Sequence, residues 1–241
     1  MPISAKLFKI EEYPNEFPIE TAPAYGQVSD ISLRTKVELL GLSEFGGLAK
    51  LNIIHDQGEN YEGVGYSSSQ GRIDDLIFVA DEKTFPAFVD SQRQWLIAAY
   101  SSKKVFNSAF SRLWKWVNTN QQSLKVNHKS VDLARLKNFF DEGDESPQIK
   151  GGWFNRLNLL NVNVAYIGGD DVSESEEWDR YETNGQISAL RLDLPNNNSD
   201  EEPIRIMLTK DATLFSYKHF TENEFLRICI PIFEVVKEFI I

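Results

Sequence analysis

The sequence predicts an α+β fold, in which a mixed or antiparallel sheet packs against helices, and three observations lead to this class. Hydrophobic residues make up 41% of the 241-residue chain, as expected for a chain that buries a core. The middle of the chain alternates apolar runs of strand length with a helical period. The last third shows several strand patterns in succession and then one amphipathic helix.

The N-terminal half is expected to hold strands joined by long loops. Four apolar or alternating runs predict strands, the first two of them forming a hairpin: 35–42, 48–56, 76–80 and 94–100. Two other stretches contain several prolines or glycines and no clear period. We therefore expect long irregular loops at residues 13–30 and 57–75.

The middle section is expected to alternate strand and helix. After Tyr100 the apolar residues recur at helical spacing, and Ser101 or Ser102 supplies an N-cap for that helix. A strand at 123–128 follows, and then a second helix that Gly143 closes.

The C-terminal part predicts a β-α-β-β-β-α unit. Its elements are a strand over 156–167, an acidic helix near 173–183, strands at 186–194, 204–210 and 213–220, and a final helix. Thr221 and Glu224 form a capping box for that last helix, and Pro231 should kink it. Its apolar face consists of Phe225, Ile228, Ile232, Val235, Val236 and Phe239.

One segment suggests a division of the chain. Residues 141–152 combine charge, a proline and paired glycines, which together interrupt the periodicity. We expect an N-terminal α/β region with long loops at 1–145 and a C-terminal α+β region at 146–241. The alternative is one continuous domain.

Composition restricts where the protein acts. No apolar run reaches the roughly 18 residues of a membrane span, and the N-terminus resembles neither a signal peptide nor a transit peptide. The only cysteine, Cys229, lies in an apolar run and is expected to be a buried structural thiol. We therefore expect a cytoplasmic location and no membrane partner.

The stretch Gly168-Gly169-Asp170-Asp171 follows an apolar strand. It resembles the first strand and tip of the metal-binding hairpin in polymerases and cyclases of the GGDD kind, where two carboxylates hold divalent metals. The next ten residues, 173–182, contain five acids and no second strand pattern. We interpret the motif as a turn before a solvated acidic helix, and no family is assigned from it.

Other catalytic patterns are weak. His55, His128 and His219 are far apart in sequence and match no zinc motif. The acids Asp193 and Glu202 with Lys210 have the residue types of a nuclease site at the wrong spacing, so we interpret them as a solvated hairpin. We expect no metal and no cofactor. The alternative is a metal-dependent nuclease or phosphodiesterase that uses Asp170 and Asp171, or Asp193 and Glu202.

The charge distribution is uneven. The chain has a net charge of −11, yet the 41 residues between Asp90 and Asp132 contain seven bases and no acid, where about six acids would be expected by chance. Several of these bases belong to the helix that follows Tyr100, on the side opposite its apolar stripe. The residues expected to contact a partner are Lys103, Lys104, Arg112, Trp114 and Lys115.

These observations favour a non-enzymatic accessory or interaction subunit of a larger complex. The basic helix could bind an acidic protein surface, or a phosphate backbone with Trp114 stacking on a base. In the simplest alternative the basic segment only balances acids of the same chain. If it is a contact surface, Lys104, Arg112 and Lys115 should be free of intramolecular carboxylate partners.

Overall fold

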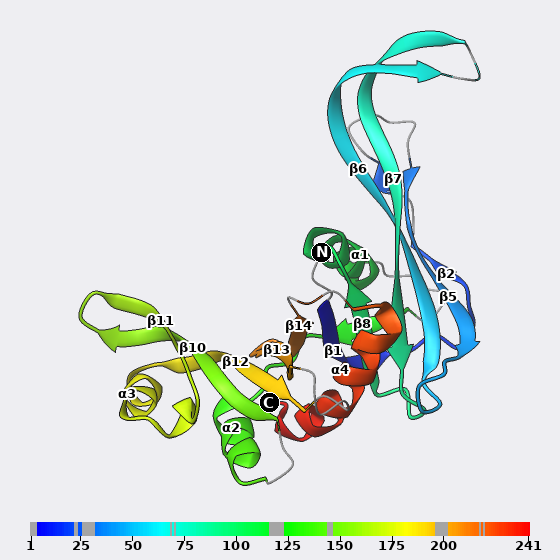
Figure 1. The fold of residues 1–241 in the computed structure, drawn as a ribbon. Coiled ribbons are helices and arrows are strands. Elements are labelled where there is room, and N and C mark those ends of the chain that lie inside the picture. Colours follow the sequence, from blue (N-terminus) through cyan, green and yellow to red (C-terminus); the bar gives the residue numbers. More distant parts are fainter. Residues whose placement is uncertain are drawn as a thin grey trace. The chain divides into compact units, whose positions relative to one another are not determined.

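The computed structural model describes residues 4–21, 24–25, 32–67, 69, 71–115, 123–143, 147–195, 202–216, 218 and 220–241. The contacts divide the chain into two compact units (Figure 1). The N-terminal unit comprises residues 10–126, and the C-terminal unit comprises residues 1–9 together with 127–241. In the part of the chain that the structure describes, the sheets are antiparallel and four α-helices accompany them, so the α+β class is confirmed. The division expected between residues 145 and 146, with one continuous domain as its alternative, stays a prediction.

The N-terminal unit is built on strands in the order β8-β7-β6-β5-β2. Their bounds are β2 (Ile19–Glu20), β5 (Thr35–Leu42), β6 (Ala49–Ser67), β7 (Arg72–Val89) and β8 (Trp95–Tyr100). The expected hairpin is present as β5 and β6, which pair from Thr35 with His55 to Leu42 with Ala49. A small separate sheet joins β3 (Ala24–Tyr25) to β4 (Ser32–Leu33). Helix α1 (Lys103–Lys115) packs on β5 and β6.

The long loop expected at residues 57–75 is wrong. Most of that stretch belongs to β6 and β7, which remain paired from Gln57 with Asp81 to Ser67 with Arg72 (Figure 1). Main-chain hydrogen bonds between the two strands hold this ribbon, so it needs no apolar alternation. Gly58 is required there because a Cβ would overlap the ring of Phe78. We call residues 58–67 and 72–80 the arm.

The C-terminal unit contains a second run of antiparallel strands, in the order β11-β10-β12-β13-β14-β1. Its strands are β10 (Gln148–Leu159), β11 (Val162–Gly168), β12 (Gln186–Leu194), β13 (Ile204–Thr209) and β14 (Thr213–Ser216). β1 (Ser4–Glu12) begins in this unit, and β9 (Lys125–Asn127) crosses the division. Its helical segments are α2 (Leu133–Asp141), η1 (Val172–Glu174), α3 (Glu176–Asn184), α4 (Glu222–Val236) and η2 (Lys237–Phe239).

The single strand expected over 156–167 is wrong. The chain turns at Leu160 and Asn161, so β10 and β11 form a hairpin. The predicted β-α-β-β-β-α order therefore has two strands, not one, before the acidic helix α3. Asn161 adopts a φ of +62°, a left-handed conformation that asparagine tolerates better than most residues. The sequence hides this turn because neither glycine nor proline interrupts the apolar run.

Three helices cover one face of the C-terminal sheet. α2 and α3 pack on β10 and β12, where Trp178 of α3 contacts Phe154 with ring centroids 5.0 Å apart. α4 carries the expected capping box: the amide of Glu224 donates to the hydroxyl of Thr221, and the amide of Thr221 donates to the Glu224 carboxylate. The buried side of α4 presents Phe225, Leu226, Cys229, Ile232, Phe233 and Val236.

Candidate functional site

The basic helix is present where the sequence predicted it. The amide of Val105 donates to the Ser102 hydroxyl at 3.4 Å, which makes Ser102 the capping residue. The helix buries Val105, Phe106, Ala109, Phe110 and Leu113. Lys103, Lys104, Trp114 and Lys115 are exposed, whereas Arg112 is half-buried.

Two of the expected contact residues already have partners in the same chain. Lys104 forms an ion pair with Glu59 of β6. The Nη1 atom of Arg112 donates to the main-chain oxygen of Asp56 at 3.2 Å, and burial lowers the pKa of this guanidinium. The expectation that Lys104, Arg112 and Lys115 are free of intramolecular carboxylates is therefore wrong for Lys104. The reason is tertiary, since the partner comes from a strand 45 residues away. Contact between this helix and a partner stays a prediction.

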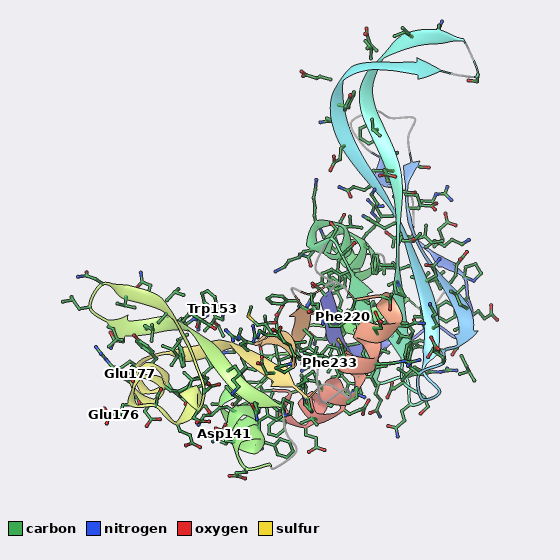
Figure 2. The ribbon with its side chains drawn as sticks, in the orientation of Figure 1. Asp141, Trp153, Glu176, Glu177, Phe220 and Phe233 are labelled. Carbon is green, nitrogen blue, oxygen red and sulfur yellow. The ribbon has the colours of Figure 1, made fainter. Side chains whose placement is uncertain are left out.

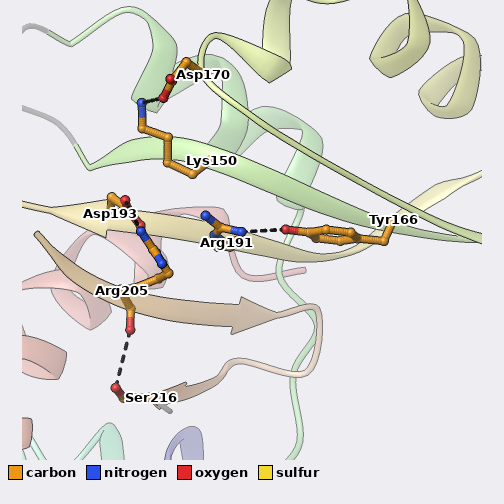
Figure 3. Close-up of polar contacts among 7 residues, drawn as sticks. All are labelled: Lys150, Tyr166, Asp170, Arg191, Asp193, Arg205 and Ser216. Atoms are coloured by element: carbon orange, nitrogen blue, oxygen red, sulfur yellow. Dashed lines mark hydrogen bonds and ion pairs between the residues drawn. The ribbon is translucent and has the colours of Figure 1, made fainter. Parts of the chain in front are cut away.

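The Gly168-Gly169-Asp170-Asp171 turn leads into helical structure, as interpreted from the sequence. Asp170 pairs with Lys150 at 2.7 Å, and this cation holds the pKa of the Asp170 carboxyl below its usual range (Figure 3). Asp171 precedes η1 with a φ of +49° and makes no side-chain cap. The cap of α3 is Ser175, whose hydroxyl accepts from the amide of Trp178 at 3.2 Å.

The second pair of candidate acids, Asp193 and Glu202, lies near one cation, because both carboxylates raise the pKa of Arg205. Asp193 is buried, not solvated as expected, and it accepts from Nε of Arg205 at 3.1 Å. Lys210 donates instead to the Gln186 side chain at 3.2 Å. Within the described ranges, no group of three or more His, Cys, Asp or Glu residues is placed to hold a metal ion. His219 lies outside those ranges.

The opposite face of the C-terminal sheet carries an aromatic pair that the sequence patterns did not reveal. Trp153 of β10 is in register with Tyr166 of β11, and their ring centroids are 4.8 Å apart. The Tyr166 hydroxyl lies over two glycines, because a Cβ at Gly151 would be 2.8 Å from it and one at Gly168 would be 2.5 Å away. These glycines therefore let the tyrosine ring lie flat on the sheet.

Two arginines continue this surface across the sheet (Figure 3). Arg191 of β12 lies beside Gly151, and its Nη1 donates to the Tyr166 hydroxyl at 2.9 Å. Its Nε atom is buried and has no hydrogen-bond partner among the described residues. Arg205 of β13 bonds Asp193, and that carboxylate raises the pKa of the arginine. Arg191 is therefore the cation of this surface whose hydrogen-bonding capacity is least used.

The surface is open to solvent. Trp153 is 38% exposed, Tyr166 40% and Val164 58%, and Leu160 at the tip of the hairpin is 91% exposed. In Figure 2, Trp153 projects on the side of β10 away from Asp141, Glu176 and Glu177, which belong to the helical side. We call Trp153, Val164, Tyr166, Arg191 and Arg205 the open face.

The edge strand beside the open face is unusual. β11 has the sequence VNVAYIG, with no charge and no proline, and in the described part of the chain it pairs only with β10. The register of this pair shifts between Asn155 and Leu159 of β10, near the turn of the hairpin. Natural edge strands are commonly protected by charges, prolines or bulges, because unprotected ones invite further strand pairing. The alternation of Val162, Val164 and Tyr166 could have indicated this site, but only once the hairpin turn at Asn161 was known.

No protein-family model matches the chain, and no curated protein is similar enough to count as a relative. No helix in the described residues is long and apolar enough to cross a membrane.

Proposed function

We propose that this chain is a non-enzymatic interaction subunit that binds a protein partner through the open face. The observation that carries the proposal is the exposed Trp153–Tyr166 pair beside Arg191, whose Nε is buried without a partner in the described structure. Trp, Tyr and Arg are the residues most enriched among those that dominate the energy of protein interfaces.

The chemistry of the face specifies the partner. An extended segment could lie beside β11, whose outer edge offers main-chain groups for pairing. Such a segment would place an apolar side chain against Trp153 and Tyr166. It would place a carboxylate against the guanidinium of Arg191, which has no carboxylate partner among the described residues, because hydrogen bonds between a guanidinium and a carboxylate are strong.

Two other functions receive less support. Nucleic acid could stack on the aromatic rings, but the chain carries a net charge of −11, and Arg205 is already paired with Asp193. A metal-dependent nuclease needs convergent carboxylates, whereas among the described residues no group of three or more His, Cys, Asp or Glu is placed to hold a metal ion, and Asp170 and Asp193 are each paired with a cation. A reducing compartment such as the cytoplasm suits a chain with one cysteine, Cys229, which is buried.

The test compares two tryptophans of similar exposure. Tagged full-length protein would be purified from the cells that naturally make it, with and without nuclease treatment, and the bound partners quantified. Trp153→Ala and Arg191→Ala should each reduce retention by about 10-fold or more, as expected when a dominant interface residue is removed. Trp114→Ala is the matched control and should retain the partners.

Three results would contradict the proposal. The partners could persist in both open-face variants, or disappear only in Trp114→Ala and Lys115→Glu, which would assign the contact to α1. Loss of the bound material after nuclease treatment would indicate nucleic acid. Circular dichroism of each variant would verify that the fold is retained.

A further inference from the structure

The arm is the other exposed feature, and beyond Glu59 its exposed apolar side chains have no role described so far. Beyond Asp56, β6 and β7 pair with each other from Gly58 opposite Ala80 to Ser67 opposite Arg72. Over this length the described structure gives neither strand a second hydrogen-bonded strand, although at the base of the arm Glu59 pairs with Lys104 of α1. A two-stranded ribbon is marginally stable in water by itself, which makes packing against another surface favourable.

One side of the arm combines apolar and acidic groups. Val64 is 67% exposed and Ile73 is 70% exposed. Val64 is in register with Asp75, and Ile73 lies two residues before Asp75 on β7, so the three side chains share one side of the ribbon. Asp75 is exposed too. Two apolar side chains therefore flank a carboxylate.

The arm also differs in charge from the open face. Residues 58–80 contain four acids and one base. Of the two arginines of the open face, Arg205 is paired with Asp193 and lies near a second acid, Glu202. Arg191 donates to the neutral Tyr166 hydroxyl, so it is the arginine of this face that has no carboxylate partner among the described residues. The arm thus presents the combination that the open face requires, an apolar contact with a carboxylate beside it.

We infer that the arm of one copy of this protein docks on the open face of a second copy. Val64 and Ile73 lie against Trp153 and Tyr166, and Asp75 approaches Arg191. This inference rests on the proposed function, because it names the partner of the same surface. Occupation of the open face would cover the uncharged β11 strand and shield the apolar side chains of the arm from water.

The contact joins two different surfaces, which has a consequence for assembly. Each copy can donate its arm to one neighbour and receive an arm from another. Copies joined in this way form a ring if the rotation closes, a reciprocal pair if two copies exchange arms, or an open chain. The contact between one arm and one open face is the same in all three.

The experiment uses charge reversal in the full-length protein. The mass of wild-type protein would be measured by sedimentation velocity over a range of concentrations, and self-association is expected. Asp75→Arg and Arg191→Glu should each weaken association by at least about 10-fold, since like charges would then meet across the contact. A mixture of the two variants should associate again, because a wild-type arm then meets a wild-type face.

A second pair of variants covers the case in which charge reversal disturbs folding. Ile73→Asp on the arm and Trp153→Ala on the face should each weaken association, and their mixture should restore it. The controls are Leu42→Asp, an exposed apolar residue at 79% outside the arm, and Trp114→Ala on α1. Both controls should associate like wild type.

The outcomes separate this inference from the proposed function. A wild-type protein that stays monomeric at every concentration, or mixtures that fail to associate, would overturn the inference. If Trp153→Ala nevertheless loses a different protein partner during purification, the proposed function stands without it. If Trp153→Ala changes neither self-association nor partner retention, both are wrong.

Discussion

Trp114 on α1 and Trp153 on β10 are both about half exposed, and each lies near basic side chains, yet their surroundings differ. Around Trp114, Lys104 is paired with Glu59, and Arg112 is half-buried against the main chain of Asp56. Beside Trp153 lies a second exposed ring, Tyr166, and an arginine with a buried N–H that no described residue accepts. The cations Lys104 and Arg112 near Trp114 therefore have partners within their own unit, whereas one N–H of Arg191 beside Trp153 has none among the described residues.

This difference shows what a charge pattern can and cannot establish. The absence of acids between Asp90 and Asp132 is a property of the sequence, but it does not determine which acids lie nearby in the fold. β6 brings Asp56 and Glu59 to the helix and neutralises part of its charge. On the sheet, the positive charge is smaller but remains available. The two surfaces therefore differ in whether their cations already have partners in the chain, and not in how many cations they contain.

The largest expected effect concerns the support beneath the open face. Trp178 is fully buried between α3 and the sheet, where it contacts Phe154 and donates from Nε1 to Glu182 at 2.9 Å. Trp178→Ala should lower the free energy of unfolding by about 3–5 kcal/mol, measured by urea denaturation. Trp153→Ala, which removes an exposed ring from the same sheet, should cost several-fold less. Equal losses would show that the open face is part of the core.

The next effect concerns α4 on the covered side of the same sheet. Ile232 is 5% exposed and lines a cavity of about 440 Å³ with Phe140 and Leu194. Ile232→Ala should lower the free energy of unfolding by about 2–5 kcal/mol, because truncation enlarges a space that the helix does not fill. The matched control is Val235→Ala, a half-buried neighbour on the same cavity, which should cost less. An unchanged denaturant midpoint for Ile232→Ala would mean that this part of α4 is not packed.

A pH dependence should arise in the N-terminal unit, beside α1. Burial, with a smaller contribution from Arg112, lowers the pKa of His55 from 6.5 to about 4, and its Nδ1 shares a 2.8 Å hydrogen bond with the Thr35 hydroxyl. The unfolded chain therefore binds a proton more readily than the folded chain between these two values. Stability should decrease as the pH falls from about 6.5 to 4, with a loss of about 2 kcal/mol at pH 5 relative to pH 7.

Chemical denaturation at pH 7 and pH 5 would measure this loss, and His55→Asn serves as the control for other titrating groups. The variant should lose less stability than the wild type over the same interval. An identical loss in both proteins would show that His55 is protonated without cost in the folded state.

The smallest expected effects concern two of the cations of α1, Lys104 and Arg112. Lys104→Gln should leave the urea midpoint unchanged, because both Lys104 and Glu59 are exposed and such pairs contribute little. Arg112→Gln should lower the free energy of unfolding by about 1 kcal/mol, because it removes the donor to the Asp56 carbonyl oxygen. A reversed order would show that the Lys104–Glu59 ion pair contributes more to stability than the hydrogen bond of Arg112.

The sequence by itself determined the elements whose signals are local. The capping box at Thr221 and Glu224, the apolar stripe of α1, the acidic helix after Asp171 and the hairpin of β5 and β6 all depend on residues a few positions apart. In each case a short-range period or cap identifies the structure, because the stabilising contacts lie within one or two turns of the chain.

Three features could be known only from the tertiary structure. They are the strand pairing in the arm, the turn at Asn161 and the partners of the charged side chains. Main-chain hydrogen bonds between β6 and β7 hold the arm. Because the ribbon is exposed on both sides, its sequence needs no alternation of apolar residues that could reveal the strands. Lys104 meets Glu59 from 45 residues away, and Arg191 meets Tyr166 from 25 residues away. Whether a side chain is available to a partner depends on such distant neighbours, and their positions are set by strand register and packing rather than by the residues beside it in sequence.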